Sequence, residues 1–390
     1  MRSLHFVACA FGLGMLLPCH AWPANWVMQA ESSLRAEYND NLRLTTTQND
    51  PVLARHLDMD MQLTGATPIS EFVLNPKYSV SQYSSKAVRD DDVATMDATT
   101  RLHGERSDSE LALAWRRDTT LTSELEDTGL IQATKYRTVR GVHPSFHYGL
   151  SERMDAQLRW DYTTVSYQNA LQTPLTDYRH QAISGTLMAK TGERDSIQLD
   201  VYGTRLEAAE IANQVIDAGF QASLTHAFYD RSYGTFTFGT HRVETKQVLP
   251  SQDFNSVYRG YSGSVSLTQK RDITLWNMQA LRSIDPSGYG QLIQNDKFLL
   301  SFYQGISPYW RYGVDGVYLR NMAMERQLSF DARRYARISA SLYWTPYRTM
   351  QLSFHYSNQW QKYASASHGA ESNEVGLSVT CQLDKKTLFP

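Results

Sequence analysis

Apolar and polar residues alternate along most of this chain, in eighteen stretches of about ten residues each. In the stretch 154–163, for example, the apolar Leu158 and Trp160 alternate with the polar Gln157 and Arg159. Successive side chains of a β-strand point to opposite faces, so each stretch has one apolar and one polar face. This pattern is typical of a wall that has lipid on one side and water on the other.

The stretches predict an all-β fold, because a tilted strand of about 9–11 residues crosses a bilayer and only a closed barrel leaves no unpaired backbone in hydrocarbon. We predict a transmembrane antiparallel up-and-down β-barrel of about 18 strands, with 16 as the alternative. A soluble β-sandwich would use shorter strands, commonly of about five or six residues. The predicted strands are 26–38, 56–66, 71–83, 95–105, 109–117, 137–150, 154–163, 179–189, 195–205, 217–228, 232–243, 258–269, 273–282, 297–306, 309–319, 332–344, 348–357 and 372–383.

The predicted connections are alternately short and long, as in outer-membrane barrels, which have short periplasmic turns and long external loops. An arginine stands at or beside each of seven short connections, at intervals of about 40 residues (Arg106, Arg153, Arg194, Arg231, Arg271, Arg311 and Arg348). A propeller blade needs four strands, whereas each interval holds two, so the repeat indicates hairpins. We expect these arginine turns to face the periplasm. The long connection 118–136 is a candidate plug for the pore.

The first residues predict an export signal. Arg2 precedes the apolar run 6–17, and Ala21 is a small residue at a suitable cleavage position. We predict a signal peptide over 1–21 and a single outer-membrane barrel domain over 22–390. A lipoprotein signal ending at Cys19 is disfavoured by the proline before it. After cleavage Cys381 is the only cysteine, so no internal disulfide can form.

Composition narrows the possible partners. The formal net charge of −2 argues against a protein that binds nucleic acid through its phosphates. Tyrosine is unusually frequent, with 23 residues beside 14 Phe and 8 Trp, and many of these aromatic residues stand at predicted strand ends, where membrane barrels carry aromatic girdles. The alternative explanation is the ordinary preference of aromatic residues for β-strands. The expected surroundings are therefore outer-membrane lipid and lipopolysaccharide.

If the apolar faces meet lipid, the polar faces line a wet lumen, because barrels of 16 to 18 strands are too wide for side chains to fill. Hydroxyl, amide, tyrosine and arginine groups together suit a carbohydrate path, and inward arginines favour carboxylated sugars. The alternative is that opposite charges simply stiffen the wall of the barrel. The candidate pore-lining residues are Arg101, Arg116, Arg159, Asp200, Tyr202, Arg311, Arg337, Tyr343 and His355.

Catalytic and metal-binding patterns are weak. His143 and Ser145 have the His-x-Ser spacing of barrel lipid deacylases, without the rest of that motif. His143 and His147 share a strand face but lie roughly 13 Å apart, too far to chelate one metal. The acidic stretches 90–92 and 124–127 need no ligand to explain them. We therefore predict no catalytic residue, no metal site and no cofactor.

The segment 30–42 resembles the first strand of outer-membrane β-barrel proteins of exopolysaccharide biosynthesis and export operons. Those proteins open with a strand that ends in Tyr-x-Asp-Asn and an aliphatic residue, matched here by Tyr38, Asp40, Asn41 and Leu42. The resemblance implies a pore for a polysaccharide that leaves the cell, with an envelope-spanning export component in the periplasm as partner. Asp40 and Asn41 also have a simpler structural role open to them, which is to cap a loop.

Three functions follow from these observations. The first is a channel that exports an extracellular polysaccharide. The alternative is a general porin or small-solute uptake channel, and a third is a barrel enzyme that modifies lipid and depends on Ser145.

Overall fold

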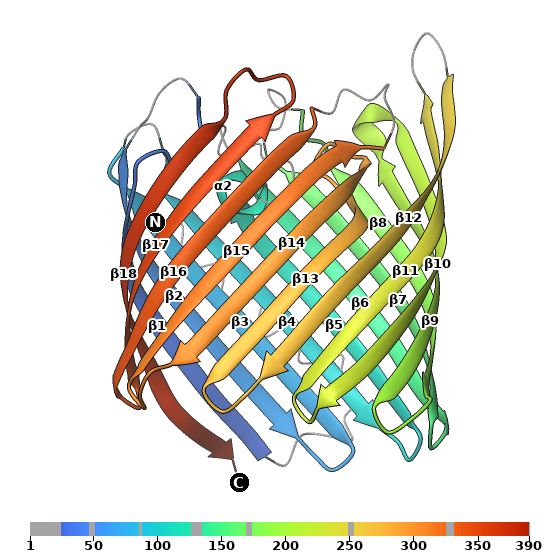
Figure 1. Ribbon diagram of the computed structural model, residues 1–390, viewed down its shortest axis with the longest axis horizontal. Helices are drawn as coiled ribbons and strands as arrows, with labels where there is room; N and C mark the ends of the chain where they lie inside the picture. The colour runs from blue at the N-terminus through green and yellow to red at the C-terminus, as the bar shows by residue number, and fades with distance from the viewer. Residues whose placement is uncertain are drawn as a thin grey trace.

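The computed structural model describes residues 25–46, 51–85, 88–125, 135–168, 174–248, 253–324 and 331–389. In these residues eighteen strands form one sheet that closes on itself as a barrel (Figure 1). The strands are β1 (Asn25–Asn39), β2 (Val52–Ala66), β3 (Ser70–Tyr83), β4 (Asp91–His103), β5 (Ser107–Thr119), β6 (Tyr136–Ser151), β7 (Met154–Tyr167), β8 (Tyr178–Lys190), β9 (Asp195–Ala208), β10 (Asn213–Tyr229), β11 (Ser232–Val248), β12 (Asp253–Lys270), β13 (Thr274–Pro286), β14 (Leu292–Gly305), β15 (Trp310–Ala323), β16 (Arg333–Tyr347), β17 (Met350–Tyr363) and β18 (Ala370–Phe389). The α-helix α2 (Thr120–Ser123) and the 3₁₀ helix η3 (Ala209–Ile211) lie in connections.

The topology is the predicted up-and-down meander. Every strand pairs antiparallel with the next one in the sequence, and β1 pairs with both β2 and β18, which closes the barrel. Each predicted strand overlaps one observed strand, so the fold class and the count of 18 are confirmed and the alternative of 16 is wrong. The predicted signal peptide at 1–21 lies outside the described residues.

Apolar side chains of the strands face the outside of the barrel, as the alternation predicts. Leu158, Val201 and Leu377 are 55%, 61% and 62% exposed on the outside of the barrel. Because neighbouring positions on a strand face opposite sides, the polar residues between them face the interior. A closed barrel with an apolar outer band is the architecture of outer-membrane proteins, and the outer membrane is where this chain resides. In the described residues, no helix is long and apolar enough to cross a bilayer.

The two ends of the barrel differ. The connections at one end, here called the tight-turn end, all have two to four residues, and the first residue of β1 and the last residue of β18 lie at the same end. The opposite end, here called the loop end, is uppermost in Figure 1 and carries every longer connection, such as 40–51 and 120–135. The predicted alternation of short and long connections is not strict, because 209–212 and 249–252 at the loop end also have only four residues. The arginines of the repeat lie in the short connections, apart from Arg311, which is the second residue of β15.

Several strands run further at the loop end than the alternation predicts. β10 begins at Asn213 and β12 at Asp253, and β17 continues to Tyr363. Beyond the lipid both faces of a strand meet polar groups, so the apolar alternation stops while backbone pairing continues. Polar side chains there form hydrogen bonds with other connections of the loop end. For example, Asn213 Nδ2 at the start of β10 donates to the carbonyl of Gly290, between β13 and β14 (2.9 Å).

The last strand also differs from the prediction. β18 does not end near 383 but continues to Phe389, whose backbone pairs with Trp26. The segment that follows residue 383 is therefore part of the barrel wall and not a tail. The charged residues Lys385 and Lys386 interrupt the apolar and polar alternation, so the pattern does not predict a strand there. The backbone nevertheless pairs with β1, for example at Met28 and Lys386.

The buried apolar side chains gather inside the loop end. One cluster joins residues of β7 to β11 with Leu175, from the connection between β7 and β8, and with the first residue of β14 (Val165, Tyr167, Leu175, Tyr178, Leu206, Ala208, Val215, Val243 and Leu292). A second cluster lies against β2, β15, β16 and β18 (Leu44, Val52, Val88, Leu121, Leu319, Tyr335 and Ala370). The interior is thus packed at its loop end, whereas polar side chains face the lumen further along the barrel.

Candidate functional site: the polar interior of the barrel

A cavity of about 710 Å³ lies inside the barrel, against β1, β2 and β13 to β18. Its wall is mainly hydroxyl, carboxylate, amide, imidazole and guanidinium groups, because inward positions of these strands are polar. Three of the predicted pore-lining residues, Arg337, Tyr343 and His355, line this cavity. The polar lining makes it a place where water and polar solutes are more stable than lipid.

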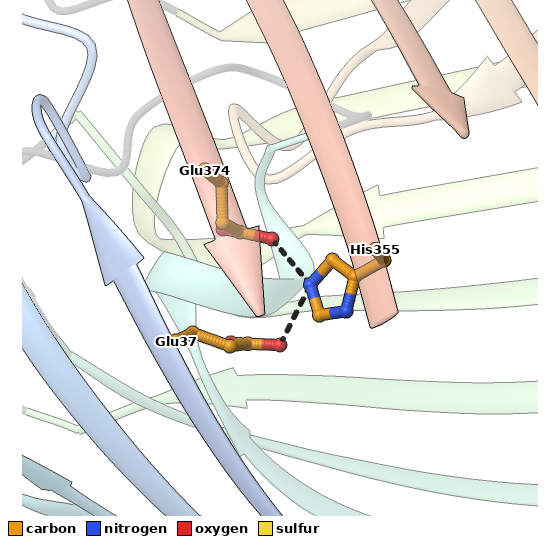
Figure 2. A group of neighbouring side chains, drawn as sticks. All are labelled: Glu37, His355 and Glu374. Atoms are coloured by element: carbon orange, nitrogen blue, oxygen red, sulfur yellow. Dashed lines mark ion pairs between the residues drawn. The ribbon is translucent and has the colours of Figure 1, made fainter. Parts of the chain in front are cut away.

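One end of this cavity carries a charged network centred on Glu37. The carboxylate of Glu37 lies 3.1 Å from Arg35 Nη1, 3.1 Å from His56 Nε2 and 3.3 Å from His355 Nε2. His355 Nε2 is also 3.4 Å from Glu374 Oε1, so the imidazole lies between two carboxylates from different strands (Figure 2). Arg35 extends the network to Asp58, at 3.8 Å.

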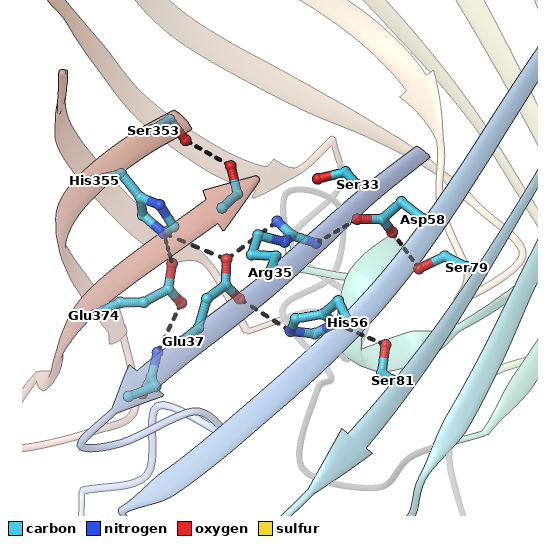
Figure 3. Close-up of polar contacts among 12 residues, drawn as sticks. Ser33, Arg35, Glu37, His56, Asp58, Ser79, Ser81, Ser353, His355 and Glu374 are labelled. Atoms are coloured by element: carbon cyan, nitrogen blue, oxygen red, sulfur yellow. Dashed lines mark hydrogen bonds and ion pairs between the residues drawn. The ribbon is translucent and has the colours of Figure 1, made fainter. Parts of the chain in front are cut away.

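Hydroxyl groups complete the network (Figure 3). Ser79 Oγ donates to Asp58 Oδ1 (2.5 Å), and Ser81 Oγ lies 3.0 Å from His56 Nδ1. The side chain of Glu37 is only 11% exposed and that of His56 10%. Charges held at this depth keep their positions because each has an opposite charge or a hydrogen-bond donor beside it.

A second polar group lies on the wall formed by β14 to β16. The guanidinium of Arg311 lies 4.7 Å from the ring centre of Tyr343 and 5.9 Å from that of Tyr303. Tyr303 donates from its hydroxyl to Asp315 Oδ2 at 2.8 Å. Two predicted residues, Arg311 and Tyr343, are thus in contact, and they present a flat aromatic and cationic surface of the kind that stacks on sugar rings.

The remaining predicted residues lie on other parts of the wall. Arg101 of β4 donates to Glu110 of β5 (2.6 Å), and Arg159 donates to Asp161 two residues further along β7 (3.0 Å). Asp200 accepts hydrogen bonds from Thr186 and Gln198, at 2.6 and 3.0 Å. Such pairing supports the structural interpretation of these residues, in which opposite charges stiffen the barrel.

Tyr202 and Arg116 have different surroundings. Tyr202 lines a smaller cavity of about 310 Å³, together with Asp217, His241 and Arg282. Arg116 is exposed on β5, where its backbone pairs with Thr95.

The candidate plug is partly in place. Residues 120–125, which include α2, enter the barrel mouth beneath the loops (Figure 1), while 126–134 lie outside the described residues. The Glu124 carboxylate is fully buried and accepts a hydrogen bond from Tyr167 Oη (2.8 Å) on β7. On another side of the mouth, Arg333 Nη2 of β16 donates to the carbonyl of Leu125 (2.6 Å). This segment therefore bridges two walls of the barrel.

The residues that carried the family resemblance have a structural role. Asp40 accepts hydrogen bonds from the backbone and side-chain nitrogens of Asn373, at 2.7 and 2.9 Å. Asn41 donates from Nδ2 to the carbonyls of Thr45 (2.9 Å) and Glu371 (2.8 Å). The predicted loop-capping role is confirmed, and the cap also fastens the first loop to β18.

The arrangement around Ser145 does not form a hydrolase site. His143 Nδ1 pairs with Asp161 (2.6 Å), which is the orientation that a catalytic imidazole would need. Its Nε2, however, points toward Gly141, where an added Cβ would meet it at 2.4 Å. Ser145 lies on the other side of His143 along the strand, so the ring nitrogen that would activate it faces away.

The network around Glu37 was not predicted as a unit from the sequence, because its contacts to His355 and Glu374 arise only when the barrel closes. β1 pairs with β2 on one edge and with β18 on the other, which places Glu37 opposite Ala54 and Gly376. The sequence does show that Arg35 and Glu37 share a strand face. It does not show which residues of the last strand face them, since that depends on the register of the closing pair.

Comparison with known proteins supports the fold. No protein-family model matches the sequence, and no curated protein matches it significantly. Among solved structures, Pseudomonas aeruginosa OccK2 (OpdF) has a TM-score of 0.51 with 10% identity, covering 95% of this chain and 100% of that one. Acinetobacter baumannii OccAB2 has a TM-score of 0.50 with 9% identity, covering 93% and 98%. Similarity at this level of identity shows that the chain has the same kind of closed outer-membrane β-barrel.

Proposed function

We propose that this protein is an outer-membrane channel for small polar solutes. The observation that carries the proposal is the cavity of about 710 Å³, lined by paired charges and hydroxyl groups, inside a barrel whose loop end is narrowed. A polar passage of this kind replaces part of a solute's hydration shell with exchangeable hydrogen bonds, which permits entry without tight retention. The arginine and tyrosine surface at Arg311 and Tyr343 suits sugars and sugar acids.

Uptake of small solutes has more support than export of a polymer. Both apolar clusters and the segment 120–125 occupy the loop end, so a polysaccharide would have to displace packed side chains to pass. The Tyr-x-Asp-Asn motif, which favoured export, is accounted for by loop hydrogen bonds at Asp40 and Asn41. Export through this barrel would require a larger opening than these contacts leave.

The direct test is swelling of liposomes that contain the purified barrel, in a series of sugars from monosaccharide to a long dextran. We expect swelling rates that fall steeply with solute size, and none with dextran. Empty liposomes are the control for leakage. The proposal is wrong if the folded barrel passes no small sugar.

A separate experiment addresses export. Deletion of the gene should leave surface polysaccharide unchanged while slowing growth on a scarce small nutrient. Loss of surface polymer, with intracellular precursors retained, would favour the export function and its periplasmic partner instead.

A further inference from the structure

Three side chains that can ligate a metal converge at the seam where the barrel closes. Glu37 comes from β1, His355 from β17 and Glu374 from β18 (Figure 2). One nitrogen and two carboxylate oxygens from these residues all lie within 4.8 Å of one another. The imidazole and the two carboxylates belong to different strands, so the barrel itself fixes their mutual positions.

The spacing of these atoms fits a metal centre. His355 Nε2 lies 3.3 Å from Glu37 Oε1 and 3.4 Å from Glu374 Oε1. Ligands about 2.0–2.1 Å from a tetrahedral Zn²⁺ ion stand roughly 3.4 Å from one another. The two measured separations therefore match edges of such a tetrahedron.

Neighbouring groups orient the ligands. Asn39 Nδ2 donates to Glu374 Oε2 (3.1 Å), which leaves Oε1 directed at His355. The His355 ring lies directly over Gly376, which has no side chain to displace it; an added Cβ there would lie 2.0 Å from ring atom Cε1. Metal ligands in proteins are commonly held in this way by a surrounding layer of hydrogen bonds.

His56 supplies a further nitrogen beside Glu37 that can ligate a metal ion. Its side chain is 10% exposed, and Nε2 lies 3.1 Å from Glu37 Oε2 without making an aligned hydrogen bond in the described part of the chain. Nδ1 lies 3.0 Å from Ser81 Oγ, a contact that can hold the proton on Nδ1 and leave the Nε2 lone pair free. A buried imidazole nitrogen aimed at a carboxylate in this way is suited to a cation.

Charge and access agree with this assignment. Two carboxylates and neutral imidazoles balance the charge of a divalent ion. Arg35 also contacts Glu37, at 3.1 Å, but its other nitrogen lies 3.8 Å from Asp58, where it can remain paired when a cation approaches Glu37. Glu37, His355 and Glu374 all line the cavity of about 710 Å³, so an ion reaches them from the lumen and water can complete its coordination.

We propose that Glu37, His355 and Glu374, with His56 beside them, form a site for a divalent transition-metal ion such as Zn²⁺. Mixed nitrogen and oxygen ligands favour this class of ion over Ca²⁺ or Mg²⁺, which prefer oxygen ligands alone. The site spans the pairing of the first and last strands, so a bound ion also cross-links the seam.

The test uses the full-length barrel without a histidine tag, purified in detergent, stripped with a chelator and titrated with Zn²⁺. Calorimetry should show one strong site per barrel, metal analysis should find about one Zn²⁺ after gel filtration, and Ca²⁺ should not compete. We expect Glu374→Gln to weaken binding at least tenfold while retaining the hydrogen bond from Asn39. His355→Ala should have the same effect.

A matched control is His226→Ala, which removes a histidine that pairs with one carboxylate, Asp195, at 2.8 Å. This variant should bind Zn²⁺ as the wild type does. Heat-modifiable migration on a gel verifies that each variant is folded. The proposal is overturned if the folded wild type retains no Zn²⁺, or if Glu374→Gln and His355→Ala bind it unchanged; the first result would mean that the cluster is an ion pair alone.

Discussion

Arg333 on β16 donates a hydrogen bond to the backbone carbonyl of Leu125 over 2.6 Å, although the two residues are 208 positions apart. Arg333 is fully buried, also donates to Gln361 (3.1 Å) and lies over the ring of Tyr335. This contact holds the segment after α2 inside the barrel mouth. Together with the hydrogen bond from Tyr167 to Glu124 on the other wall, it keeps this segment in the opening.

Replacement of Arg333 by alanine should widen the channel. The variant loses the hydrogen bonds to Leu125 and Gln361, so the segment 120–125 keeps its attachment to Tyr167 on β7 but loses the one to β16, and it can move away from that wall. We expect a higher single-channel conductance in planar bilayers and faster swelling with disaccharides. Arg334→Ala, at the exposed neighbouring position, is the control and should conduct as the wild type does. Equal conductance in both variants would show that this segment does not limit flow.

We expect Tyr167→Phe to lower the stability of the barrel, because Tyr167 donates a hydrogen bond to the buried carboxylate of Glu124. Tyr167→Phe keeps the ring in its apolar cluster but removes the hydroxyl that donates to Glu124. A hydrogen bond to a charged group typically contributes about 1.5–3 kcal/mol, and Glu124 keeps its ion pair with Arg137 at 3.7 Å. The free energy of unfolding in detergent should fall by that amount, as measured by denaturant titration. Tyr229→Phe, at a site 72% exposed, should change it little.

An arginine introduced at Leu158 on β7 should destabilise the barrel, whereas an arginine at the adjacent Gln157 should not. Leu158→Arg places a guanidinium in lipid, at a cost of about 2–4 kcal/mol near the bilayer midplane, whereas Gln157→Arg places it in the wet lumen. We expect only the first variant to lower the temperature at which the folded band disappears on a gel. If the two variants unfold alike, the assignment of lipid and lumen faces is wrong.

Arg337 lines the main cavity, so its charge should influence ion selectivity. Arg337→Glu reverses one charge inside the pore, and the reversal potential in a salt gradient should shift toward cation preference. Arg231→Glu, which reverses a charge in a two-residue turn outside the cavity, provides the comparison. A shift of the same size in both variants would mean that the cavity is not on the ion path.

Asp40→Ala tests whether the Tyr-x-Asp-Asn motif is structural. Both hydrogen bonds to Asn373 are lost, so we expect a destabilisation of about 1–3 kcal/mol with unchanged conductance of the folded barrel. The measurements are denaturant unfolding and planar-bilayer recording. A large change in conductance without loss of stability would instead give the motif a role in transport.

The sequence predicted the wall of this barrel well because the lipid acts on each strand locally. Leu158 and Gln157 reveal their faces without reference to any other strand. The contacts of Glu37 with His355 and Glu374 could not be predicted in the same way, because they need the register between β1 and β18. Strand ends outside the lipid, such as Lys386 in β18, were missed for the related reason that no apolar surface marks them.

The pairing of β1 with β18 has a consequence for biogenesis. Asn39 and Glu374 are cross-strand partners 335 positions apart, so the final closure has to bring together remote parts of the polypeptide, and such non-local pairing is slow. Until it happens the sheet has two unsatisfied edges, which hydrocarbon does not tolerate. Membrane insertion and the pairing of the first and last strands must therefore proceed together.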